Sequence, residues 1–113
     1  ASLGLGVAVI VDQPASFADC IAPKTSEMKP GGNLAHTDLR SVKWSRKDLS
    51  GAYLRGAYLR YADLRGANLS GADLSHANLG QAKLMGVRAT NLRGCPERLP
   101  SGWVCKNNSL IQR

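Results

Sequence analysis

The stretch Gly51–Leu84 reads GAYLRGAYLRYADLRGANLSGADLSHANLGQAKL, with leucine at every fifth residue, alanine two places before it and often glycine two places after. An α-helix needs apolar residues about every 3.6 residues, and a half-buried strand needs strict alternation. A period of five fits neither pattern. The glycines would also each cost a helix about 1 kcal/mol. The stretch therefore predicts one small structural unit stacked on itself.

The five-residue period extends beyond this stretch in both directions. Its centres run from Leu34 to Ala89, and ten of the twelve are leucine, with Trp44 replacing one of them. The register then slips, because the next leucine is at position 92. A unit that turns a corner every five residues always places the same position inside. We therefore expect the central leucines and small alanines to fill the interior, with glycine or a small polar residue at corners of unusual φ.

The run ADLRGANLSGADLSHANLGQ, residues 62–81, resembles the A-(D/N)-L-x-x motif of the pentapeptide-repeat family, and the resemblance covers about residues 33–92. It implies an all-β fold, a right-handed quadrilateral β-helix (solenoid) with four pentapeptides per coil. Twelve units then make about three coils with short end caps. At the usual inter-strand spacing the repeat body would be about 15 Å tall.

The first units of the repeat match the motif poorly. Units such as TDLRS and VKWSR lack alanine at the expected place, and Lys47 stands where a small inward residue belongs. The first coil is therefore expected either to be distorted or to direct the Lys47 ammonium outward, as long basic side chains do.

The remainder of the chain divides around the repeat. The apolar run Leu3–Val11 has about nine residues, whereas a spanning helix needs about 20, so no transmembrane segment is expected. The small residues that follow resemble the end of a targeting peptide, and a cap is the alternative. The expected organisation is a targeting remnant or N-terminal cap at 1–18, an irregular lead-in at 19–32, the β-helix at 33–92 and a C-terminal cap at 93–113.

Both ends of a stack of coils need covering, because an open coil exposes unpaired backbone groups. Val7–Val11 or Ile21 is the candidate cover at the N-terminal end. Four apolar residues are the candidates at the other end: Trp103, Val104, Leu110 and Ile111.

Three cysteines, Cys20, Cys95 and Cys105, contain no C-x-x-C pair, so a zinc site is not expected. Cys95 and Cys105 are the candidate disulfide, holding the C-terminal cap. Cys20 could replace either one, and one thiol is left over in every case. His36 and His76 fall two coils apart, about 10 Å by stacking, which is too far to share a metal ion.

With four five-residue units in each coil, residues twenty apart in the sequence lie directly above one another. The sequence therefore predicts which outward side chains are neighbours on the surface. A basic and aromatic band is expected across adjacent faces, made of Arg40, Tyr53, Arg55, Tyr58, Arg60, Tyr61 and Arg65. Arginine with tyrosine suits phosphate contact, base stacking and protein interfaces. The net charge of +7 and the sequence pI of about 9.8 agree with an anionic partner. The alternative is a solvated belt that keeps the protein soluble.

No catalytic constellation occurs in the sequence: there is no G-x-S-x-G, H-E-x-x-H or P-loop motif. The aspartates at 38, 48, 63 and 73 share one repeat position that also takes asparagine. Such side chains are expected to bond the backbone at a corner. We therefore expect neither an enzyme nor a cofactor nor a metal site.

The function expected is a non-catalytic protein-interaction or scaffold module with an unknown protein partner. The cysteines and the targeting-like start favour an extracytoplasmic place, meaning secretion, the periplasm or the thylakoid lumen, with the cytoplasm as the alternative. The alternative function is binding of nucleic acid or another polyanion through the Arg/Tyr band. Long dimeric members of the family mimic DNA and bind gyrase, but that needs an acidic rod, and this chain is basic and short. The oligomeric state is not predicted.

Overall fold

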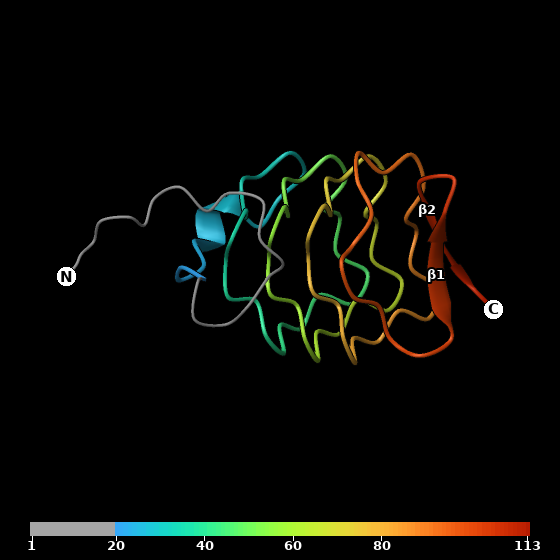
Figure 1. Ribbon diagram of the computed structural model, residues 1–113. Helices are drawn as coiled ribbons and strands as arrows, with labels where there is room; N and C mark the ends of the chain where they lie inside the picture. The colour runs from blue at the N-terminus through green and yellow to red at the C-terminus, as the bar shows by residue number, and fades with distance from the viewer. Residues whose placement is uncertain (1–19) are drawn as a thin grey trace, which may run out of the picture.

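The computed structural model describes residues 20–113, in which the chain winds in successive turns along one axis (Figure 1). The expectations for residues 1–18, including the Val7–Val11 cap, lie outside the described residues. A 3₁₀ helix, η3 (Thr25–Glu27), precedes the turns. An antiparallel hairpin of β1 (Trp103–Lys106) and β2 (Ser109–Gln112) follows them.

Parallel backbone bridges join residues twenty apart in neighbouring turns, as the repeat predicts. The bridges define four walls, which we number in chain order. The first wall carries Asn33, Tyr53 and Asp73; the second Asp38, Tyr58 and Asn78; the third Lys43, Asp63 and Lys83; the fourth Asp48, Asn68 and Arg88. Within residues 20–113, extended strands occur only in the hairpin. A corner every five residues limits each wall to a single bridged residue per turn.

The corners have one backbone conformation. The residue two places after each centre has a positive φ in every unit, from 52° at Asn91 to 74° at Gly86. In the units centred on residues 39 to 84, the N–H of the next residue donates to the carbonyl of the centre, as from Ala57 to Leu54 at 3.0 Å. A positive φ at the third residue is the feature of a type II turn, where glycine carries no steric penalty. Glycine therefore recurs here, at five of the twelve corners, but larger residues such as Arg46, Tyr61 and His76 adopt the same conformation, which the expectation of glycine or a small polar residue did not include.

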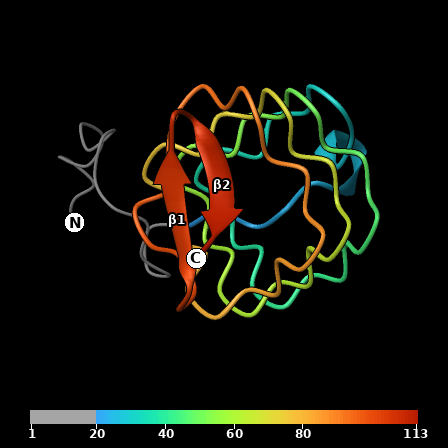
Figure 2. The same cartoon turned by 90° about the vertical axis from the view of Figure 1, so that its right-hand side faces the viewer.

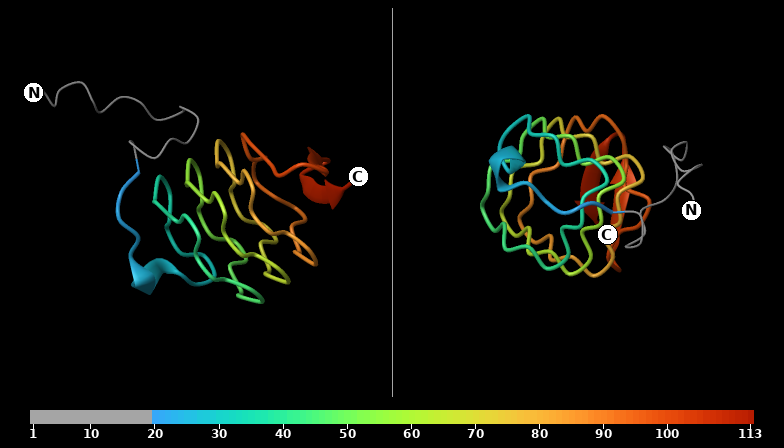
Figure 3. Two further views of the ribbon diagram at one scale, coloured as in Figure 1. Left: turned by 90° about the horizontal axis from the view of Figure 1, so that it is seen from below. Right: turned by 90° about the vertical axis from the view of Figure 1, so that its left-hand side faces the viewer.

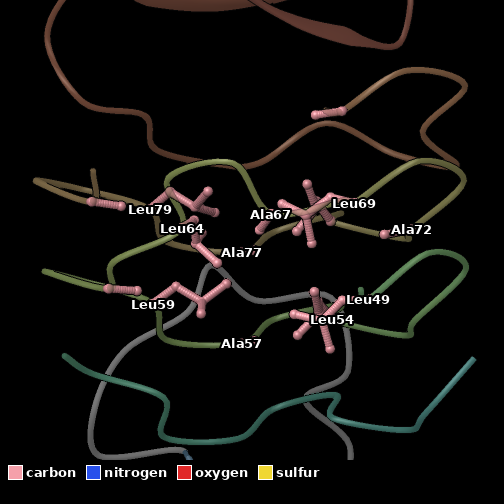
Figure 4. Packing of buried hydrophobic residues seen from close by; sticks show 14 of the residues in the cluster. Leu49, Leu54, Ala57, Leu59, Leu64, Ala67, Leu69, Ala72, Ala77 and Leu79 are labelled. Carbon is pink, nitrogen blue, oxygen red and sulfur yellow. The ribbon is translucent and has the colours of Figure 1, made fainter. Parts of the chain in front are cut away.

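The core is a stack of leucines and alanines. The centres Leu49–Leu79 and the alanines before them are 0% exposed, and leucines of successive turns lie one above another (Figure 4). Trp44 occupies a centre and is 5% exposed. Lys47 is half-buried, and its backbone keeps the regular bonds to Trp44 and Asn68, at 3.0 and 2.9 Å. The first turn is therefore regular despite the poor motif.

The stacking continues beyond the last recognisable pentapeptide. Leu92 remains 3% exposed, and Gly94 and Arg98 bridge Asp73 and Asn78. One extra residue is accommodated before Gly94. A Cβ atom at Gly94 would collide with the Ser75 hydroxyl oxygen, so only glycine lets the backbone pass this close.

The hairpin lies across the C-terminal end of the turns (Figure 2). The Leu110 N–H donates to the Ala89 carbonyl at 2.9 Å, and the Leu110 side chain is 7% exposed. Trp103 is partly buried and packs against the core. Ile111, in contrast, is 42% exposed and is not among the residues that pack on the core. Cys95 and Cys105 form a disulfide with their Cα atoms 5.9 Å apart, which ties β1 to the last turn.

At the N-terminal end, the segment leading into η3 crosses the opening of the first turn (Figure 3). The Ile21 N–H donates to the His36 carbonyl at 2.7 Å, and its own carbonyl accepts from Asp38 at 2.8 Å. The Ile21 side chain is 57% exposed. Ile21 therefore covers backbone groups rather than the core, because its side chain points away and Met28 packs there instead.

Candidate interaction surface

The aspartates of the repeat bond the backbone at the corners, as the sequence predicts. Each accepts a hydrogen bond from the N–H two residues later, from Arg40, Ser50, Arg65 and Ser75 at 3.0–3.2 Å. The hydrogen bonds from the Ser50 backbone and side chain lower the pKa of Asp48. These carboxylates hold turns together, which explains why asparagine replaces aspartate at this position.

The seven residues of the expected Arg/Tyr band are divided among three walls. Tyr53 and Arg55 flank a centre of the first wall. Arg65 flanks a centre of the third, and the remaining four lie on the second wall or at its corner: Arg40, Tyr58, Arg60 and Tyr61. The three groups differ in how far their charges are already neutralised.

The second wall combines arginine with tyrosine. Arg40 Cζ lies 6.0 Å from the centroid of the Tyr58 ring, and Arg60 Cζ lies 5.3 Å from that of Tyr61. Arg60 Nη2 also donates to the Tyr61 hydroxyl at 3.5 Å, and this hydrogen bond raises the pKa of Arg60. Arg60 is therefore a permanent cation whose direction is set by Tyr61.

The surface of this wall is hollowed in two places. One is lined by residues that include Arg40, Tyr58 and Tyr61. The other is lined by Arg60 and Arg98 together with Gly80, Gln81, Pro100 and Ser101. The sequence missed Arg98 because it lies beyond the last pentapeptide. Its bridge to Asn78 is what places it on this wall.

Arg93 is a second arginine that the repeat pattern missed, and it lies over the first wall. Its Cζ is 4.5 Å from the centroid of the Tyr53 ring. Its Nε and Nη2 donate to the carbonyls of Gly71 and Gly51 at 2.9 and 2.8 Å. Arg93 thus ties two corners and a tyrosine together, and it covers one side of Tyr53.

On the third wall Arg65 is committed to Asp63. Its Nε and Nη2 donate to the two carboxylate oxygens at 2.9 and 2.8 Å. The Arg65 side chain, and then its backbone N–H, lower the pKa of Asp63 from 3.8 to about 2. The same side-chain hydrogen bond raises the pKa of Arg65. The Arg65 guanidinium therefore binds the Asp63 carboxylate through two hydrogen bonds, which compensate its charge.

The part of the chain that the structure describes, residues 20–113, holds no group of three or more His, Cys, Asp or Glu side chains that could bind a metal ion. It also contains no helix with the length and apolarity needed to cross a membrane. His36 and His76 lie on either side of Gly56, and His76 Nδ1 is 3.8 Å from the Glu97 carboxylate.

Twenty-residue turns, a leucine and alanine core and bonded aspartates at the corners define a repeat protein built from five-residue units. The family model for pentapeptide repeats matches residues 33–71 and 52–88, with eight copies. The chain belongs to the pentapeptide-repeat family, whose repeats imply a β-helix and whose members are generally non-enzymatic structural or interaction modules. Comparison with curated proteins finds no match.

Proposed function

We propose that the protein is a non-catalytic interaction or scaffold module, with residues 33–92 forming a right-handed quadrilateral β-helix. The observation that supports this most strongly is the closed core. Leucine and alanine fill the interior at 0% exposure, and the repeat aspartates are bonded to the backbone. The outward side chains are then the part of the repeat available to a partner. The proposed boundaries keep residues 93–113 as the C-terminal cap.

An extracytoplasmic place is part of the proposal: the outside of the cell, the periplasm or the thylakoid lumen. The Cys95–Cys105 disulfide supports it, since disulfides persist mainly in oxidising compartments. The test is the intact mass of the protein from its native source, with thiols alkylated before any reduction. A single alkylated thiol supports export. Three alkylated thiols would place the protein in a reducing compartment.

The proposed binding face is the Arg/Tyr band: Arg40, Tyr53, Arg55, Tyr58, Arg60, Tyr61 and Arg65. Replacing Arg55, Arg60 and Arg65 with alanine tests it by affinity capture of a partner from the native source. We expect capture to be lost while the melting curve is retained. A control variant removes the same charge from other positions, by Arg46→Ala, Lys83→Ala and Arg88→Ala. Equal loss in both variants would contradict a specific face.

The alternative function is binding of nucleic acid or another polyanion through the same band. The net charge of +7 and the Arg60–Tyr61 stacking contact favour it, since arginine and aromatic rings together bind single strands. Fluorescence anisotropy with a labelled single strand at several salt concentrations tests it. A steep loss of affinity with salt, weakened by the triple alanine variant, is the expected signature.

A further inference from the structure

We propose that the hollow between Arg60 and Arg98 on the second wall binds the carboxylates of an acidic segment of a partner protein. This inference deepens the proposed interaction function and rests on it. It names the position on the surface, the chemistry of the ligand and a residue, Arg98, that the repeat pattern does not contain.

The first support is that neither Arg60 nor Arg98 is paired with a carboxylate of the described residues. Arg60 stacks on the Tyr61 ring and donates to the Tyr61 hydroxyl, and neither group is a counterion for its charge. Arg98 is exposed and has no carboxylate partner in the same part of the chain. The adjacent Glu97 carboxylate lies instead toward His76, at 3.8 Å. The hollow therefore carries two positive charges without a counterion from the described residues.

The other arginines of the neighbouring surface are already engaged. Arg40 Nε contacts Asp38 at 3.1 Å, and Arg65 holds Asp63 in a two-point contact. Arg93 is bonded to two backbone carbonyls. Arg40 and Arg65 are thus paired with carboxylates and the Arg93 donors are occupied, whereas the described residues supply no carboxylate to Arg60 or Arg98 at the hollow.

The second support is the space beside Arg60. A Cβ atom at Gly80 would lie 3.1 Å from Arg60 Nη1 and 3.1 Å from Asn78 Oδ1, so the guanidinium rests close against the glycine backbone. The remaining lining residues are Gln81, Leu99, Pro100 and Ser101, of which Gln81 and Ser101 carry polar side chains. A guanidinium presents a planar set of donors that matches the two oxygens of a carboxylate. The Tyr61 contact orients that set before the ligand arrives.

The number of available charges favours an acidic protein segment over nucleic acid. A nucleic acid backbone needs a track of cations, because its affinity comes from many phosphate contacts. Here the next arginine along the wall, Arg40, is bonded to Asp38, so the described wall does not continue the track of available cations. Two free guanidiniums in one hollow suit two neighbouring carboxylates, such as a Glu-Glu pair.

The test is a titration of the isotope-labelled protein with an acetylated Gly-Glu-Glu-Gly peptide at low ionic strength. The backbone amide shifts of the protein are measured by NMR. We expect saturable shifts at the amides of Gly80, Gln81 and Ser101. Arg60→Gln and Arg98→Gln should each weaken binding about tenfold or more, since each removes a charge-assisted hydrogen bond. Arg88→Gln is the matched control, because it removes one exposed charge from the fourth wall, and it should change affinity less than about twofold.

Several outcomes would overturn the proposal. Shifts that avoid these three amides, or an equal loss in Arg88→Gln, would mean general attraction to a basic surface. Tighter binding of a single-stranded oligothymidylate at the same amides would replace the acidic segment with nucleic acid. Melting curves of the variants that match the parent exclude loss of folding as the cause.

The interaction function is tested separately. If a partner is captured by the parent protein and equally by Arg98→Gln, the hollow is wrong and the interaction module stands. The variant that tests the band apart from the hollow replaces Arg55 and Arg65 with alanine and keeps Arg60. If the peptide binds at the hollow while this double variant captures the same partner as the parent, the wider Arg/Tyr band is wrong and the acidic-ligand site stands.

Discussion

The guanidinium of Arg93 stacks on the ring of Tyr53, a residue of an earlier turn, with Cζ 4.5 Å from the ring centroid. The same guanidinium donates to the carbonyls of Gly51 and Gly71. One side chain from beyond the pentapeptide run therefore links three turns of the chain. The contact extends the cap along the outside of the molecule.

Replacing Arg93 with alanine should lower the free energy of unfolding by about 1–2 kcal/mol. The variant loses two charge-assisted hydrogen bonds and a cation–π contact at an exposed site. Urea unfolding followed by circular dichroism measures it. Arg88→Ala is the control, because this exposed arginine lies on the fourth wall, and it should change stability by less than about 0.5 kcal/mol. Equal losses of stability in Arg93→Ala and Arg88→Ala would show that the contacts of Arg93 do not stabilise the fold.

Truncating Leu64 should destabilise the repeat strongly. Its side chain is 0% exposed, so Leu64→Ala should cost about 2–5 kcal/mol through lost burial and the cavity left behind. Leu64→Asp should prevent folding, because it buries a charge without a partner. The 69% exposed Met85 supplies the control, and Met85→Ala should be nearly neutral. A Leu64→Asp protein that melts like the parent would refute the inside and outside assignment.

The stability of variants at Gly71 should decrease in the order in which the new residue tolerates a positive φ. Its φ is 73°, and a Cβ atom there would meet nothing closer than 3.9 Å, so backbone strain is the main term. Gly71→Asn should be tolerated best, Gly71→Ala should cost about 1 kcal/mol, and Gly71→Val more. Thermal unfolding of the three variants gives the order. If valine were as stable as asparagine, the corner would have to differ from the one described.

Removing the disulfide should loosen the C-terminal cap. The bond closes a ten-residue separation between Cys95 and Cys105, and chain-entropy estimates give about 2–3 kcal/mol for such a loop. Replacing both cysteines with serine should lower the unfolding free energy by about that amount. Hydrogen exchange should accelerate first at Leu92 and Leu110, whose amides bond across the cap. Uniform acceleration along the whole chain would argue against a separate cap.

Acid should weaken the third wall in a defined range. The pKa of Asp63 falls from 3.8 to about 2 because Arg65 bonds its carboxylate. A lowered folded-state pKa means that this contribution to stability is complete above the unfolded value and is lost as pH falls from about 4 to about 2. NMR titration of the carboxyl carbon measures the pKa. In Arg65→Gln the pKa should return toward 3.8, and an unchanged low value would contradict the assigned cause.

Much of the fold is predictable from the sequence because one local rule is repeated. Leucine at ten of the twelve centres, alanine two places before seven of them and a corner two places after each one repeat the same five-residue unit. The twenty-residue stacking and the buried leucines follow from that rule. Lys47 departs from the motif without distorting the turn, because its backbone bonds do not depend on the side chain.

The candidate surface is less predictable for a physical reason. The sequence predicts a band of seven arginines and tyrosines. Whether each of them is available to a partner depends on the side chains that lie beside it in space. Only the structure shows that Arg65 is held by Asp63 and that Tyr53 is covered by Arg93. Arg93 and Arg98 carry no repeat signal, since the register has already slipped where they occur.

The sequence by itself determined the repeating turn, the identity of the interior residues and the outward direction of the rest, because these are local and recur every five residues. Only the tertiary structure decided how the ends are closed and which cations remain uncompensated. Those features depend on contacts between the last turn and earlier ones, such as Arg98 beside Arg60. No periodic pattern encodes a contact that occurs once.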